Sequence, residues 1–202
     1  MEQKIEVDKL IFDFVYELAL RDAVMRTAYL GDKSELRKNE DAKNIVRDYA
    51  NETVNGKSFD YNKFYKIAEE LCRKFNPEIN DELKFTFGNA QKLLNMTMKY
   101  LYIMCYDNKK LRENFRHCHC PMDGIMIDKV KKEFKNCSRK EKEEHIGKFK
   151  YKSWSRLTFT NKDKEAYNQF QESVKFLAKK QNLSPLEYDY YLWNKKEETT
   201  AD

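Results

Sequence analysis

Residues 90–106, AQKLLNMTMKYLYIMCY, decide the fold of this chain. Wound as an α-helix, the stretch carries apolar side chains around most of its circumference: Leu93, Leu94, Met96, Met98, Leu101, Ile103 and Met104. A helix that is apolar on all sides is buried at the centre of a protein. The stretch therefore predicts a central helix around which the other elements pack. Lys92 and Lys99 are anomalous cations on it, and their spacing of two turns puts them on one face.

Helical patterns continue on both sides of this stretch. The chain before Gly31 reads as a long amphipathic helix, with Leu10, Phe14 and Leu18 on its apolar stripe and with Ile11 and Val15 widening it. Further helices are predicted over 40–53, after the N-cap candidate Asp60 as far as Asn76-Pro77, from Pro121 onward, over 163–180 and from Ser184-Pro185, an N-cap followed by a proline at the first helical position. Only 5 Gly and 3 Pro are present, too few for the many tight turns of a sandwich or barrel. The predicted class is all-α.

Composition narrows the kinds of protein that this chain can be. Its 202 residues, 41% of them hydrophobic, suffice for one domain or for two small lobes that share a cleft. We expect residues 1–196 to form one compact helical unit and residues 197–202 to form a disordered tail. No apolar run approaches a membrane span, and no signal peptide opens the chain. Five Cys, an odd count, then suggest reduced thiols in a cytoplasmic protein without membrane contact.

The charge is mildly basic. Lys and Arg total 39 against 34 Asp and Glu, which gives a net charge of +5 and permits an anionic partner. The run from Lys129 to Lys152 is rich in Lys and Arg. It is either a solvated face or a surface that faces phosphates.

Two short motifs carry residues suited to chemistry. The segment 87–92 reads as a tight turn that feeds a helix, and the backbone N–H groups of Gly88, Asn89 and Ala90 could hold a phosphate there. Lys92 follows in the first turn, where an amine could act as a nucleophile. Further along the chain, Cys120-Pro121-Met122-Asp123 places a carboxylate at another helix start, a position that favours an anion.

These motifs resemble the helix-hairpin-helix DNA glycosylase superfamily, and most closely its archaeal 8-oxoguanine DNA glycosylase branch. In that branch a Lys opens a hydrophobic helix, a second Lys follows two turns later, and a Pro-x-Asp comes after; here these are Lys92, Lys99 and Pro121-Met122-Asp123. A C-terminal helix with Asp and Trp four apart is matched by Asp189 and Trp193. The likeness covers roughly residues 85–130 and 184–194.

The resemblance implies two helical lobes with a helix-hairpin-helix motif and a cleft between them. Lys92 would attack the sugar C1′ and form a Schiff base, and Asp123 would steer protons and stabilise positive charge on the sugar. The target base would be flipped out of double-stranded DNA by a monomer that needs no cofactor. The remaining expected site residues are Gly88, Asn89, Ala90 and Lys99 on the DNA backbone, with support of Asp123 as the alternative for Lys99, and Trp193 and Asp189 at the flipped base.

Departures from the family pattern leave the substrate open. Ala90 stands where a second Gly is commoner, and Gly124-Ile125 follows Asp123 where many relatives are polar or basic. By resemblance 8-oxoguanine is the first substrate, and the alternative is another damaged base or a modified base of viral DNA. Strand nicking by an AP lyase step is also open. The rival class is a non-catalytic helical module that binds a nucleotide or a nucleic acid.

Two further segments have more than one interpretation. The Cys and His of 116–120, RHCHC, alternate in a way that is not the spacing of a zinc finger or knuckle, so we expect no metal site. His119, close to Asp123 in sequence, is instead a candidate for the base pocket. The segment 151–156, YKSWSR, suits either a nucleic-acid groove or a surface loop anchored by Trp154.

Overall fold

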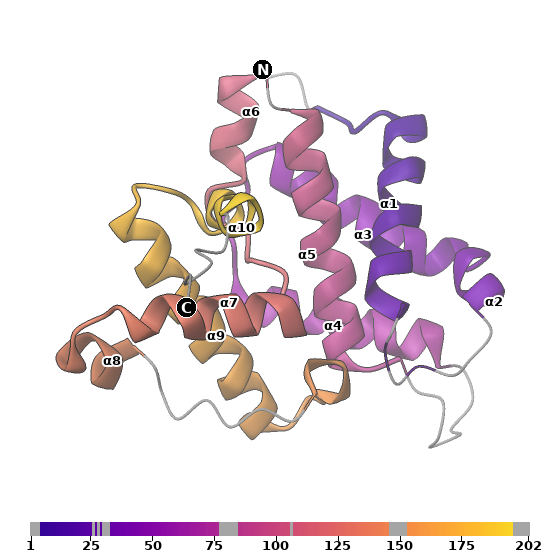
Figure 1. The fold of residues 1–202 in the computed structure, drawn as a ribbon. Coiled ribbons are helices and arrows are strands. Elements are labelled where there is room, and N and C mark those ends of the chain that lie inside the picture. The colour runs from indigo at the N-terminus through magenta and orange to yellow at the C-terminus, as the bar shows by residue number, and fades with distance from the viewer. Residues whose placement is uncertain are drawn as a thin grey trace.

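The computed structural model describes residues 5–25, 27, 29, 33–76, 85–105, 107–145 and 153–195. Every element within these ranges is a helix, which confirms the predicted all-α class (Figure 1). The elements are α1 (Lys9–Val24), α2 (Lys33–Arg37), α3 (Glu40–Val54), α4 (Tyr61–Phe75), α5 (Phe87–Met104), α6 (Lys109–Asn114), α7 (Gly124–Lys135), α8 (Arg139–His145), η1 (Trp154–Arg156, a single 3-10 turn), α9 (Asn161–Lys180) and α10 (Pro185–Asn194). Gly31 and the tail 197–202 lie outside the described residues, and the division into two lobes stays a prediction.

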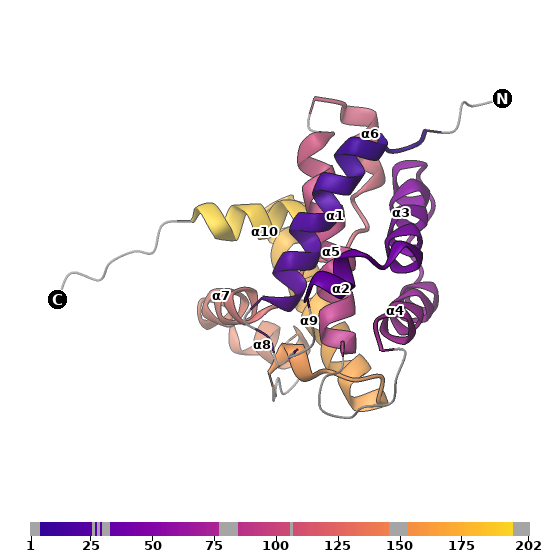
Figure 2. The same cartoon turned by 90° about the vertical axis from the view of Figure 1, so that its right-hand side faces the viewer.

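Helix α5 is the central element, as the sequence predicts. It is buried along nearly its whole length and contacts α1, α3, α4 and η1 (Figures 1 and 2). The helix begins three residues earlier than expected, because Thr86 caps it. The Thr86 hydroxyl accepts a hydrogen bond from the Asn89 N–H, and the Asn89 side chain accepts one from the Thr86 N–H. Lys92 therefore lies in the second turn of α5 and not in the first.

Helix α1 buries a different face from the predicted one. Leu10 is 80% exposed, and Ile11 and Phe14 are exposed as well. The buried residues of α1 are Phe12, Val15, Tyr16, Ala19, Leu20, Ala23 and Val24, and α1 packs mainly against α5. Ala19 and Ala23 bring two small residues to this face, which lets α1 lie close against α5. The predicted stripe is therefore wrong at Leu10, Ile11 and Phe14, whereas Val15 is buried as expected and Leu18 is partly buried.

Helix α7 begins later than the proline signal predicts. Pro121 lies in a non-helical stretch, residues 118–123, and the first helical residue is Gly124. Asp123 is the N-cap, with its Oδ1 accepting from the Met126 N–H at 2.9 Å. This cap leaves Asp123 at the junction of the 118–123 segment and α7. No helix in the described ranges is both long enough and apolar enough to serve as a membrane span.

Candidate functional site

A cavity of about 720 Å³ lies where α1, α5, α7, η1 and α10 meet. Its lining includes five of the residues expected at the site: Lys92, Lys99, Asp123, Asp189 and Trp193. Lys92 and Lys99 reach it from the same face of α5, as their two-turn spacing predicts. The cavity therefore gathers residues that are far apart in the sequence.

Lys92 and Asp123 form an ion pair on the cavity wall. The Lys92 Nζ lies 3.1 Å from the Asp123 Oδ2, and the two side chains are only 12% and 14% exposed. The two carboxylate oxygens of Asp123 have separate partners, because Oδ1 is held by the backbone of α7 and Oδ2 faces the amine. The backbone bond fixes the orientation of the carboxylate toward Lys92.

Two buried glutamines explain why these distant residues meet. Gln91 accepts a hydrogen bond from the Met122 N–H at 3.2 Å and donates one to the Met122 carbonyl at 2.7 Å. Gln171 of α9 forms the same pair of bonds with Cys120, at 3.1 and 2.8 Å. The backbone of the 118–123 segment is thus clamped from two helices. Lys92 directly follows Gln91, and Asp123 directly follows Met122. The hydrogen bonds between Gln91 and Met122 therefore bring Lys92 and Asp123 together.

The second cation of α5 forms a buried pair of its own. The Lys99 Nζ lies 2.5 Å from the Asp189 Oδ2, and the Asp189 side chain is fully buried. Burial raises the pKa of the Asp189 carboxyl, and the charge of Lys99 opposes that rise. The Lys99 Nζ also lies 5.1 Å from the Tyr190 ring centroid and 5.5 Å from that of Trp193. Lys99 therefore lines the cavity with Asp189 as its ion-pair partner, and its expected contact with the DNA backbone stays a prediction.

Trp193 combines a pocket position with exposure. Its side chain lines the cavity, yet the residue is 47% exposed. The Lys129 Nζ lies 5.9 Å from its ring centroid. An aromatic ring that is accessible within a cavity can stack on a planar ligand.

The predicted phosphate contacts of the hairpin do not match the structure. Gly88 donates its N–H to the Leu157 carbonyl at 3.2 Å, Asn89 to the Thr86 hydroxyl, and Ala90 to the Thr86 carbonyl. All three residues are buried. Because the helix start is capped by Thr86 and covered by η1, these N–H groups have no room for a phosphate. The assignment of Gly88, Asn89 and Ala90 to the DNA backbone is wrong for this structure.

His119 also lies away from the cavity. It is buried in an aromatic cluster, with its ring centroid 4.0 Å from that of Phe59 and its Nδ1 2.7 Å from the Tyr167 hydroxyl. Burial holds the pKa of the imidazole well below its usual value. The His119 ring contacts both α4 and α9, with centroid distances of 5.5 Å to Phe64 and 5.4 Å to Tyr167. The prediction that His119 lines the base pocket is therefore wrong.

Several residues of the cavity escaped the sequence reasoning. Tyr100 donates its hydroxyl to the Asp22 Oδ2 at 2.5 Å, which ties α5 to α1 at the cavity. Trp154 of η1 also lines it; the sequence suggests a nucleic-acid groove or a loop anchor for this residue but does not place it beside Lys92. Helical spacing could have predicted three of the cavity residues, because Met96, Tyr100 and Ile103 lie on the same face of α5 as Lys92 and Lys99. Nothing in the sequence marks Asp22 or Trp154 as neighbours of that face.

The cysteine-rich segment is part of the core. Within the described ranges, no three His, Cys, Asp or Glu side chains gather so as to hold a metal ion. Cys118 and Cys120 are buried, and burial raises the pKa of the Cys118 thiol to about 12. These thiols are therefore protonated packing groups at neutral pH.

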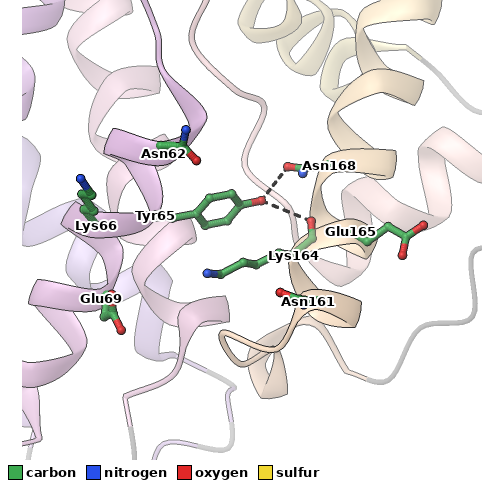
Figure 3. A pocket seen from close by; sticks show the side chains of 8 residues that line it. All are labelled: Asn62, Tyr65, Lys66, Glu69, Asn161, Lys164, Glu165 and Asn168. Carbon is green, nitrogen blue, oxygen red and sulfur yellow. Dashed lines mark hydrogen bonds between the residues drawn. The ribbon is translucent and has the colours of Figure 1, made fainter.

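A second hollow lies between α4 and α9 (Figure 3). Its volume is about 530 Å³. Its lining includes two lysines, Lys66 and Lys164, and two glutamates, Glu69 and Glu165. The Tyr65 hydroxyl bonds to Asn168 and to the Lys164 carbonyl across it. Its charges balance, and among the described residues that line it no amine lies within ion-pair distance of a carboxylate. The cavity that contains Lys92 is thus the stronger candidate site.

No protein-family model, curated protein or solved structure matches this chain. The candidate site therefore stands on its own geometry and on the motifs quoted above.

Proposed function

We propose that the protein is a DNA glycosylase that acts as a monomer on double-stranded DNA and excises a damaged or modified base. The observation that carries the proposal is the Lys92–Asp123 pair, 3.1 Å apart on the wall of a cavity of about 720 Å³. A nucleophile beside a group that can accept its proton is the arrangement that covalent catalysis requires. The cavity also supplies an accessible ring, Trp193, to receive a flipped base.

The chemistry uses the two groups in turn. Asp123 Oδ2 accepts a proton from the Lys92 ammonium, and the freed electron pair of Nζ bonds to the sugar C1′. The bond between C1′ and the base breaks, and the base leaves with its electron pair and takes up the proton that Asp123 accepted. The C1′–O4′ bond then opens, O4′ takes the proton from Nζ, and a Schiff base joins the lysine to the sugar. In the lyase alternative, a base removes a C2′ proton from this adduct, the electron pair forms a C2′–C3′ double bond, and the C3′–O3′ bond breaks with the 3′ phosphate as leaving group, which nicks the strand.

The other pocket residues then hold the base. Trp193 stacks on it, and Lys99, which is held by the buried carboxylate of Asp189, offers a cation to its edge. By resemblance, 8-oxoguanine is the first substrate to test, followed by other damaged bases and by modified bases of viral DNA.

Borohydride trapping tests the proposal directly. The protein is incubated with a panel of duplexes, each carrying one modified base, and borohydride reduces any Schiff base to a stable cross-link. We expect base release and a cross-link with the wild type, and no cross-link with Lys92→Ala. Asp123→Asn should slow the reaction by about 10²–10⁴-fold. The control is Lys164→Ala, which removes a lysine outside this cavity, with its Nζ 5.0 Å from the Tyr65 ring centroid, and should react as the wild type.

The rival candidate is a non-catalytic module that binds a nucleic acid in the same cavity. The observation that favours it is the Lys92–Asp123 ion pair itself. Ion pairs between largely buried side chains also occur as purely structural contacts. This module would bind DNA with salt dependence but release no base from any duplex of the panel, and Lys92→Ala would leave its binding unchanged. A purely structural interaction protein would show no salt-dependent affinity for DNA.

A further inference from the structure

The turn that contains Trp154 covers the amine of Lys92. The Lys92 Nζ lies 4.6 Å from the centroid of the Trp154 ring, while Asp123 approaches the same nitrogen at 3.1 Å. The amine is thus held by a carboxylate and an indole face at once. A cation over an indole is attracted by the negative face of the ring, and Trp is the strongest partner of this kind.

The start of α5 fixes this turn in place. The Gly88 N–H donates to the Leu157 carbonyl at 3.2 Å, and the Thr86 hydroxyl donates to the Ser155 carbonyl at 2.7 Å. A Cβ built on Gly88 would lie 2.0 Å from the Trp154 carbonyl oxygen, far inside a van der Waals contact. Only glycine permits this approach of the two backbones. The glycine that the sequence associates with a phosphate therefore serves to dock Trp154.

We propose that Trp154 is a positioning residue for Lys92: its indole holds the amine beside Asp123 and shields it from water, and Gly88 docks the turn that carries the indole. The catalytic consequence rests on the proposed function, but the placement of the amine does not. A displacement of about 1 Å in a reacting group can cost about 10²-fold in rate. Loss of the indole should therefore slow the bond-forming step more than it weakens DNA binding.

The first test separates rate from affinity. With a reactive duplex, Trp154→Leu should lower the single-turnover rate of cross-link formation by about 10–100-fold while the Kd for DNA changes by less than about threefold. Trp154→Phe keeps a ring and should recover most of the rate. Gly88→Ala displaces the same turn without altering the indole, so it should lower the cross-linking rate by as much as Trp154→Leu does. The control is Phe159→Leu, which removes another ring near the turn, one that packs on Phe87 at 5.2 Å.

The second test needs no DNA. Formaldehyde and cyanoborohydride methylate accessible lysine amines, and peptide mass spectrometry follows Lys92 separately, with Lys164 as the internal standard. Methylation of Lys92 should be slow in the wild type, several-fold faster in Trp154→Leu and near the wild-type rate in Trp154→Phe.

The two tests fail in distinguishable ways. An unchanged methylation rate of Lys92 in Trp154→Leu overturns the shielding, and an unchanged cross-linking rate in that variant overturns the positioning, with the glycosylase proposal intact in both cases. If no duplex gives a cross-link but Lys92 methylation responds as expected, the placement of the amine stands and the glycosylase proposal fails. Should Gly88→Ala not fold, Trp154→Leu alone decides.

Discussion

Asp189 is a fully buried carboxylate whose only cationic partner within ion-pair distance, among the described residues, is Lys99. Removing one member of a buried pair leaves an uncompensated charge, which typically costs about 3–5 kcal/mol. We expect Lys99→Met to lower the free energy of unfolding at neutral pH by that amount, as measured by urea denaturation. The double variant Lys99→Met/Asp189→Leu removes both charges and should recover most of the loss. A double variant no more stable than the single one would show that packing, and not charge, is responsible.

The same pair predicts a dependence on pH. Burial raises the folded-state pKa of Asp189 above its unfolded value of 3.8, and Lys99 restrains that rise. A raised carboxyl pKa gives a stabilising contribution that is complete below the unfolded pKa and is lost as pH increases through the folded pKa. Without Lys99 the folded pKa rises further. The stability deficit of Lys99→Met should therefore shrink as pH falls from neutral, and a deficit independent of pH would contradict this account.

The glutamine clamp acts at the level of whole elements, because it joins α5 and α9 to the 118–123 segment. Gln171→Leu leaves the Cys120 N–H and carbonyl without their partners, at a cost of about 1–3 kcal/mol for each unpaired buried group. We expect lower stability in urea together with faster amide exchange at Cys120. Exchange at Met122 should change less, because Gln91 still holds it. Equal loss of protection at both amides would mean that the two glutamines do not act separately.

The elements that the sequence predicts well are those with local signals. Asp60 and Ser184-Pro185 cap their helices as expected, since a cap depends only on a few neighbouring residues. The buried face of α1 and the start of α7 were mispredicted, because packing against α5 and the glutamine clamp decide them. The candidate site divides in the same way. Lys92 and Asp123 follow from motifs, whereas Trp154 comes from a turn that only tertiary contacts bring to the amine.

Across the whole molecule, the distribution of charge bears on where DNA would lie. Helix α7 begins beside Asp123 at the cavity and then presents Lys131 and Lys135, both exposed and four residues apart, on one face. They belong to the basic run Lys129–Lys152, of which residues 146–152 lie outside the described part of the chain. A basic surface that continues from the cavity would bind the strand on either side of a flipped nucleotide.

This placement predicts how the affinity for DNA responds to salt. Each phosphate contact contributes about 0.9 to the slope of log K against log salt concentration. If α7 lies along the strand, Lys131→Gln/Lys135→Gln should reduce the magnitude of that slope by about 2, as measured by fluorescence anisotropy with an unmodified duplex. The control Lys66→Gln/Lys109→Gln removes the same charge from α4 and α6, helices that contribute no residue to the cavity, and should leave the slope unchanged. If both pairs reduce the slope equally, the response reflects net charge alone, and the basic run is a solvated face.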